Sequence, residues 1–90
     1  MTEDVVNLTS QRIMSIIKEK LKETNGECID YCLEHIFDEC ELSKLKLKLH
    51  IVCKGICTSQ IVSDCLSYED ISKIHDIIRE FAKHNKINIM

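Results

Sequence analysis

Apolar residues recur along this chain at spacings of three and four, which is the period of an amphipathic α-helix. The pattern begins at Ile13 and continues almost to the last residue. It is seldom interrupted, because the chain has no proline and only two glycines. The sequence therefore predicts an all-α fold in a single domain, residues 1–90, built from four to five short amphipathic helices.

The first two predicted helices are bounded by residues that favour helix ends. Thr9 or Ser10 caps the start of the first helix, and residues 1–8 are expected to form a flexible N-terminus. Thr24-Asn25-Gly26 ends this helix, since Asn and Gly tolerate the left-handed backbone of a helix C-cap. The second helix is predicted from about Glu27 to Cys40.

The third segment is compatible with two kinds of secondary structure. Leu45-Lys46-Leu47-Lys48-Leu49 alternates with period two, as a half-exposed strand does. A helix starting at Ser43 also fits, with one apolar stripe formed by Leu42, Leu45, Leu49, Val52 and Ile56. Leu and Lys favour helices, and we identify no second strand with which this segment would pair. We therefore interpret it as a helix that ends near Gly55.

Two further helices are predicted in the last third of the chain. A short one spans about Ser59 to Leu66. The last begins at the cap residue Ser67, and Asp70, three positions later, supplies the acceptor of a capping box. Asn85 is expected to terminate it, and residues 86–90 are expected to form a loose tail or to dock on a partner.

The composition suggests that this core is marginal without a partner. Aromatic residues make up 4% of the chain and Trp is absent, so the core rests on Ile, Leu, Val and Cys. A chain of this size buries only about 60–65% of the surface that its unfolded form exposes. We therefore expect the apolar stripes to complete their core on a partner helix, and the stripe residues that are candidates for this contact are Ile13, Ile17, Ile29, Phe37, Leu49, Ile74 and Ile78.

Charge and targeting signals exclude several functions. The net charge is −3, and the only basic cluster is small, so direct nucleic-acid binding is not expected; that cluster consists of Lys44, Lys46, Lys48 and Lys54. No stretch approaches the roughly 20 apolar residues that cross a membrane. The N-terminus lacks the basic and apolar regions of a secretory signal, so we do not expect glycosylation at Asn7.

The six cysteines allow three interpretations. Cys28 and Cys32 are four residues apart, as are Cys53 and Cys57, so on helices each pair would share one face. Two disulfides between these pairs would resemble the disulfide-clamped helical chaperones of the mitochondrial intermembrane space, which is the alternative function we consider. A Cys₄ zinc site is a further possibility. The third interpretation is that reduced cysteines pack in the core as small apolar residues, and it agrees with the absence of a secretory signal.

The sequence contains no recognisable catalytic motif. There is no Gly-rich phosphate loop and no nucleophile elbow, and the acidic residues are spread over the polar faces. The histidines do not pair with acidic residues at a catalytic spacing; they are His35, His50, His75 and His84. We therefore predict a protein that is not an enzyme and has no cofactor.

Several short motifs occur in a characteristic order from about Gln11 to His84. They are Lys20-Leu21-x-Glu23-Thr24, Leu33, Leu47-Lys48-x-His50, Thr58, Val62, Leu66 and Ile78-Arg79-x-Phe81. Together they resemble the enhancer of yellow 2 family. These small eukaryotic proteins are shared between the deubiquitinase module of the SAGA coactivator and the nuclear-pore complex that couples transcription to mRNA export. Glu41-Leu42 departs from the family, which usually has Gly-Trp at this turn.

The resemblance implies a specific fold and function. Five helices would form an articulated hairpin that wraps around a partner helix, and no residue would be catalytic. The implied protein is an adaptor in the nucleoplasm and at the nuclear pore, linking SAGA-dependent transcription and histone deubiquitination with mRNA export. Its partners would be the long helix of an mRNA-export scaffold protein and a helix of a deubiquitinase-module adaptor. The matching residues that would line the groove are Leu21, Leu33, Leu47, Val62 and Phe81.

Overall fold

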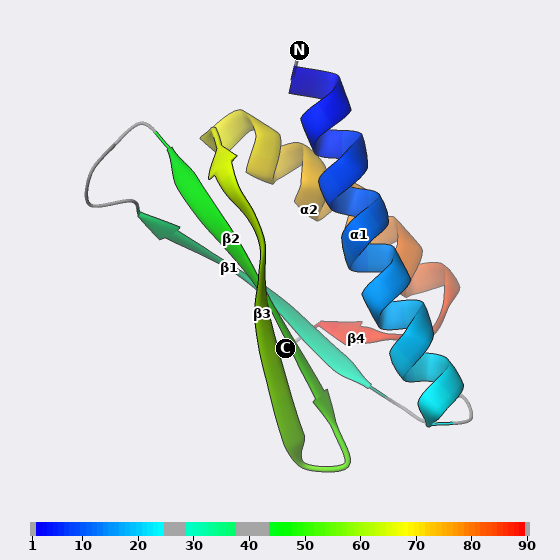
Figure 1. Ribbon diagram of the computed structural model, residues 1–90. Helices are drawn as coiled ribbons and strands as arrows, with labels where there is room; N and C mark the ends of the chain where they lie inside the picture. Colours follow the sequence, from blue (N-terminus) through cyan, green and yellow to red (C-terminus); the bar gives the residue numbers. More distant parts are fainter. Residues whose placement is uncertain (1, 25–28, 38–43, 90) are drawn as a thin grey trace.

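A computed structural model describes residues 2–24, 29–37 and 44–89 of the protein (Figure 1). The fold is α+β, so the predicted all-α class with four to five helices is wrong. The elements, in chain order, are α1 (Thr2–Glu23), β1 (Asp30–Phe37), β2 (Leu45–Cys53), β3 (Ile56–Leu66), α2 (Tyr68–His84) and β4 (Asn88–Ile89). The three middle segments that we predicted as helices are therefore strands.

The strands form one sheet in the order β3-β2-β1-β4. β2 pairs antiparallel with β1 on one side and with β3 on the other. β4 is short and pairs in parallel with the start of β1, through Asp30↔Asn88 and Tyr31↔Ile89. Figure 1 shows α1 and α2 packed on the same side of this sheet, so the sheet has a helix-covered face and an open face.

The alternation in β2 is that of a strand with one buried face. Leu45, Leu47, Leu49 and Ile51 point toward the helices and are almost fully buried, whereas the residues between them are only half-buried. The predicted helical stripe would have combined Leu45 and Leu49 with Val52 on one face. β2 instead forms its backbone hydrogen bonds with two neighbouring antiparallel strands. The sequence analysis had rejected a strand here because it identified no partner strand, and β1 and β3 are those partners.

A two-residue turn joins β2 to β3. Lys54 (φ 53°) and Gly55 (φ 80°) both have positive φ, as a type I′ turn requires, and the flanking residues Cys53 and Ile56 pair with each other. The predicted helix end near Gly55 is thus a hairpin turn. Because side chains in a strand alternate with period two, this turn also decides which residues of β3 face the helices.

β1 and β3 replace the predicted second and fourth helices. β1 is rich in aromatic and β-branched residues, which favour strands, and it buries Tyr31 and Leu33 under the helices. In β3 the pairing with β2 shifts between Ile61 and Ser63 and again before Leu66, so two irregularities interrupt the alternation. Because of these bulges, the sequence of β3 lacks the regular period-two alternation that predicts a strand.

The two helices and their ends agree better with the predictions. α2 begins after Ser67, whose side chain accepts from the Asp70 backbone N–H while the Asp70 carboxylate accepts from the Ser67 N–H, so the predicted capping box is confirmed. Asn85 is its C-cap, also as predicted. α1 begins at Thr2, so Thr9 and Ser10 lie inside the helix and the predicted cap at either of them is wrong. Val6 extends the buried face of the helix toward its start.

The tail after α2 is partly tied to the sheet. Ile87 is buried, and the backbone N–H of Asn88 donates to the carbonyl oxygen of Ile29 at 3.2 Å. The predicted turn at Asn25 and Gly26, the predicted cap Ser43 and the Glu41-Leu42 pair lie outside the described residues. Among the described helices, none combines the length and the apolar character needed to cross a membrane.

Candidate functional site

Most residues predicted to face a partner helix are buried in the protein's own core. Nine of the twelve lie there: Ile13, Ile17, Ile29, Leu33, Leu47, Leu49, Val62, Ile74 and Ile78. Leu21 and Phe81 are partly buried against the same core, and Phe37 is exposed. The two helices and the sheet bury these side chains against each other, so the described residues show no helix-sized groove lined by them.

Four of the exposed large apolar side chains lie on α1 and β3. Val5 (38% exposed) and Leu8 (67%) lie on α1, and Ile56 (68%) and Ile61 (50%) lie on β3. The other exposed large apolar residues among those described are Phe37 and Tyr68. Val5, Leu8 and Ile56 lie on the helix-covered side of the β3 edge, whereas Ile61 pairs with Lys48 and therefore faces the open side. Exposed apolar side chains on both sides of this edge make it the best candidate for an interaction surface.

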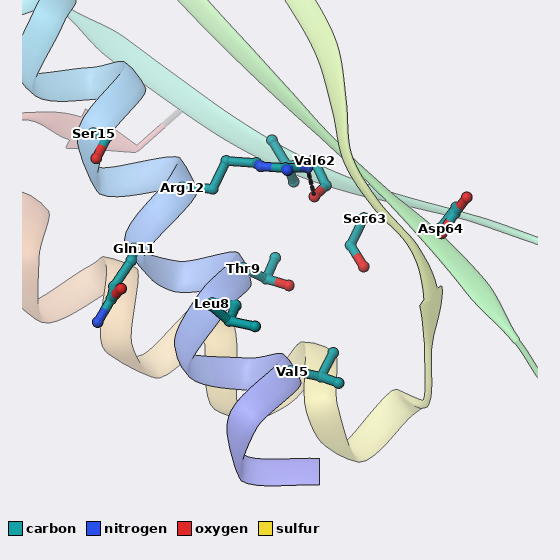
Figure 2. A pocket seen from close by; sticks show the side chains of 9 residues that line it. All are labelled: Val5, Leu8, Thr9, Gln11, Arg12, Ser15, Val62, Ser63 and Asp64. Atoms are coloured by element: carbon teal, nitrogen blue, oxygen red, sulfur yellow. Dashed lines mark hydrogen bonds between the residues drawn. The ribbon is translucent and has the colours of Figure 1, made fainter. Parts of the chain in front are cut away.

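A groove separates the N-terminal half of α1 from the C-terminal half of β3. Figure 2 shows Val5, Leu8 and Arg12 on the helix facing Val62 and Ser63 on the strand. The groove has a volume of about 560 Å³. Arg12 Nη1 spans it and donates to the carbonyl oxygen of Val62 at 3.1 Å. This hydrogen bond ties α1 to β3 at the residue where the pairing of β3 with β2 is irregular.

The groove continues along the rest of α1 and β3. A second hollow of about 230 Å³ lies between Ile16 and Lys20 of α1 and Thr58 and Gln60 of β3. A third, of about 160 Å³, lies between Lys20 and Ile56, beside the hairpin turn. The three hollows follow one another along β3, so α1 and this strand leave a furrow over most of the strand's length.

β3 is an outermost strand of the sheet, so one side of its backbone has no partner strand among the described residues. Residues that lie opposite each other in an antiparallel ladder alternate between hydrogen-bonded and non-hydrogen-bonded pairs. In a two-residue hairpin, the pair beside the turn is hydrogen-bonded. Counting from the Cys53↔Ile56 pair, the N–H and C=O groups of Cys57, Ser59 and Ile61 point away from β2. These three residues therefore offer backbone donors and acceptors to an added strand.

The charge pattern of this edge is unusual for the chain. No residue from Gly55 to Ser63 is charged, although 30% of the chain is Asp, Glu, Lys or Arg. Lys54 lies at one end of this uncharged stretch and Asp64 at the other. Exposed edge strands are usually protected by charges, and the edge between these two residues has none.

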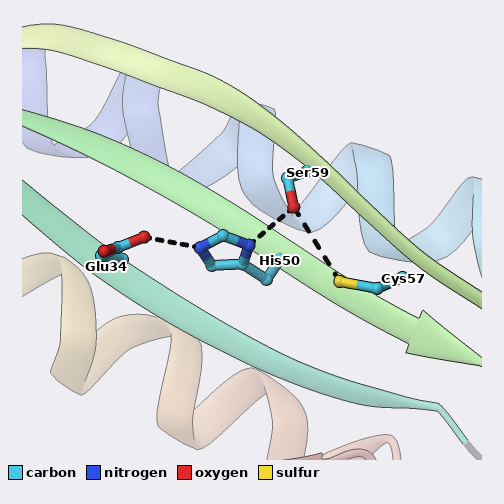
Figure 3. Close-up of polar contacts among 4 residues, drawn as sticks. All are labelled: Glu34, His50, Cys57 and Ser59. Atoms are coloured by element: carbon cyan, nitrogen blue, oxygen red, sulfur yellow. Dashed lines mark hydrogen bonds and ion pairs between the residues drawn. The ribbon is translucent and has the colours of Figure 1, made fainter.

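The open face of the sheet carries a row of polar side chains. His50 on β2 contacts Glu34 on β1, with 2.8 Å between Nε2 and Oε1, and Ser59 on β3, with 2.6 Å between Nδ1 and Oγ (Figure 3). Ser59 Oγ is also 3.9 Å from Cys57 Sγ. In the neutral tautomer whose Nε2–H donates to the carboxylate, Nδ1 accepts from the Ser59 hydroxyl.

This row has the order of a carboxylate, a base and a hydroxyl, and the sequence analysis missed it. The three residues lie 16 and 9 positions apart, on three different strands, so only the pairing register brings them together. In a sheet, such neighbours are also ordinary cross-strand pairs that stabilise the ladder. The row lies on a shallow surface, where a hollow lined by Cys32, Glu34 and His50 is its nearest concavity.

The described cysteines do not have the arrangement that the disulfide and zinc interpretations require. Cys32, Cys53 and Cys57 are free thiols on three different strands. Cys53 pairs with Ile56 and Cys57 with Val52 across the hairpin, so Cys53 and Cys57 point to opposite faces of the sheet instead of sharing one helix face. Cys28 and Cys40 lie outside the described residues. Within the described part of the chain, no three His, Cys, Asp or Glu side chains are grouped so as to hold a metal ion.

Burial and neighbouring charges shift the pKa values of two titratable groups, Tyr31 on β1 and His75 on α2. Burial raises the pKa of the Tyr31 hydroxyl above its ordinary value of 10.0, although Arg79 acts in the opposite direction. Burial is also the main reason why the pKa of His75 lies below 6.5, followed by the nearby Arg79 and His35, while Asp76 opposes them. His35 further forms a ring cluster with Phe37 and Tyr68, with centroids 6.1 to 6.4 Å apart.

Comparison of the chain with protein families, with curated proteins and with solved structures finds no match.

Proposed function

We propose that this protein is a non-catalytic interaction module that binds an extended protein segment along the free edge of β3. The observation that carries the proposal is the coincidence of two features on one strand. The backbone groups of Cys57, Ser59 and Ile61 face outward, and exposed apolar side chains of α1 and β3 flank them. An added strand would pair with the backbone and bury the apolar side chains at the same time.

The furrow favours an extended segment over a helix as the occupant. Its three hollows follow the direction of β3, as the side chains of an added strand do when every second residue points to the same face. Main-chain hydrogen bonds would supply affinity, and the hollows would select apolar side chains at alternate positions. The opposite edge of the sheet is less open, because β4 pairs with the start of β1.

A random peptide library displayed against the purified protein tests this proposal. We expect the selected peptides to alternate apolar and polar residues with period two. Ile61→Lys should weaken their binding by at least about tenfold, because a lysine on an edge strand opposes strand addition. Circular dichroism and urea unfolding would verify that the variant is folded.

Phe37→Lys is the matched control, since Phe37 is about as exposed as Ile61 and lies on a different strand. It should bind the selected peptides as the unmodified protein does. Peptides that bind Ile61→Lys and the unmodified protein equally would contradict the proposal.

The nuclear role implied by the family resemblance stays a prediction. A wrap of five helices around a partner helix is not part of the proposal, because residues 30–37, 45–53 and 56–66 form strands. A nuclear partner that presented an extended segment to β3 would be compatible with both the implied role and the described fold. Purification of the tagged protein from nuclear extract, with Ile61→Lys as the negative control, would test this role.

A further inference from the structure

We propose that the segment bound at this edge is β3 of a second copy of the same chain, so that the protein forms a two-fold symmetric dimer through antiparallel β3 strands. This inference rests on the proposed function, because it uses the same edge. It goes beyond that function by naming the partner and the register. The two sheets would join into one continuous sheet with all helices on the same side.

The outward backbone groups fix the register. Cys57, Ser59 and Ile61 are three outward-facing residues with Ser59 in the middle. A two-fold axis through Ser59 pairs it with the Ser59 of the second copy and pairs each Cys57 with an Ile61. All outward groups of both strands are then used, which gives about six inter-chain hydrogen bonds. An axis through a neighbouring residue would leave part of them unpaired.

The same register matches a protruding side chain with a hollow. With the axis at Ser59, Ile56 of one copy lies opposite Val62 of the other. Ile56 is 68% exposed and points to the helix side, since its partner Cys53 packs partly against the core. Val62 lines the largest hollow of the furrow, together with Val5 and Leu8. Each Ile56 would therefore enter this hollow on the other copy, and symmetry makes the contact twice.

Charge complementarity also favours this arrangement. Lys54 and Asp64 are equally distant from Ser59 in the sequence, on opposite sides. Antiparallel pairing about Ser59 brings the turn that carries Lys54 in each copy toward the end of β3 that carries Asp64 in the other, at both ends of the uncharged stretch. A parallel arrangement would place like charges together. Between these two residues the edge has no charge that could select a strand from another protein.

Analytical ultracentrifugation of the full chain over a range of concentrations tests the dimer. We expect a monomer–dimer equilibrium, and we expect Lys54→Glu and Asp64→Lys each to raise the dissociation constant at least about tenfold. An equimolar mixture of these two variants should associate again, since one copy then carries two negative ends and the other two positive ends. Lys83→Glu, which makes the same charge change on α2, should associate as the unmodified chain does.

Ile56→Asp examines the apolar contact independently and should abolish association, because it would bury a carboxylate in the hollow. The circular dichroism of each variant would show that the fold is kept, as expected for exposed positions. A chain that stays monomeric at millimolar concentration would overturn the dimer. So would a dimer that tolerates Ile56→Asp and both charge reversals, because it would use another surface.

The two proposals can fail separately. A monomer that binds selected peptides in a way that Ile61→Lys prevents would overturn the dimer and leave the proposed function standing. A monomer that also binds no peptide through this edge would overturn both.

Discussion

The two faces of the sheet differ in what they contribute to the protein. On β2, the side chains of Leu45, Leu47 and Leu49 lie under the helices and are almost fully buried. Their neighbours Lys48 and His50 point to the open face and stay partly accessible to water. The covered face supplies the hydrophobic free energy of folding, whereas the open face contributes cross-strand polar pairs. Substitutions on the open face should therefore leave the fold intact.

The largest effect is expected on the covered face. Leu47→Ala removes a fully buried side chain, and it should lower the free energy of unfolding by about 2–5 kcal/mol. Lys48→Ala, the adjacent change on the open face, should alter it by no more than about 0.5 kcal/mol. Urea unfolding followed by circular dichroism would measure both. Equal losses would contradict the division between the two faces.

A smaller effect is expected at the turn that determines which residues belong to each face. Gly55 has φ 80°, and no heavy atom lies within 4 Å of the position where a Cβ would be placed. Gly55→Ala should therefore destabilise the protein by about 1 kcal/mol through backbone strain alone. Thermal unfolding would measure the loss, and Lys54→Gly, which relieves a positive φ, should act in the opposite direction.

The polar row on the open face should contribute less. A double-mutant cycle with Glu34→Gln and His50→Gln should give a coupling of about 0.2–1 kcal/mol, because the Glu34 carboxylate is exposed and water screens the pair. Equilibrium unfolding of the four proteins would give this value. A coupling well above this range would indicate that the open face is shielded from solvent, for example by a bound partner.

The smallest effect concerns pH and the helix above the covered face. The folded protein favours neutral His75, because its pKa is lowered mainly by burial, whereas the unfolded chain binds a proton near pH 6.5. Stability should therefore fall as the pH drops below about 6.5, until the lowered folded-state pKa is passed. His75→Gln should flatten this part of the profile, and His84→Gln, a change at an exposed histidine of the same helix, should not.

The sequence allowed both ends of α2 to be predicted, but neither the start of α1 at Thr2 nor the sheet. The capping box at Ser67 and Asp70 is a local signal, and it was read correctly. The period-two pattern from Leu45 to Leu49 was recognised but assigned to a helix, because its partner strands were not identified. Strand pairing joins residues far apart in the chain, so no local window contains it.

The sequences around β1 and in β3 explain why these two strands were predicted as helices. Ile29 and Leu33 are four apart, which fits a helix as well as a strand, because in a strand both also face the same side. In β3 the bulges between Ile61 and Leu66 break the alternation that would have revealed it. The candidate site could not be predicted for the same reason: the furrow and the polar row exist only once the register of β2 and β3 is known.

The short parallel pairing of β4 with β1 has a consequence for the order of folding. The β2–β3 hairpin closes over two residues, whereas Asp30 and Asn88 meet only after more than half of the chain has been organised. Closing a loop over such a separation has a high entropic cost, and only two residue pairs form to offset it. We expect the β4 strand to form last and open first. Native-state hydrogen exchange should find its amides exchanging long before those of the hairpin.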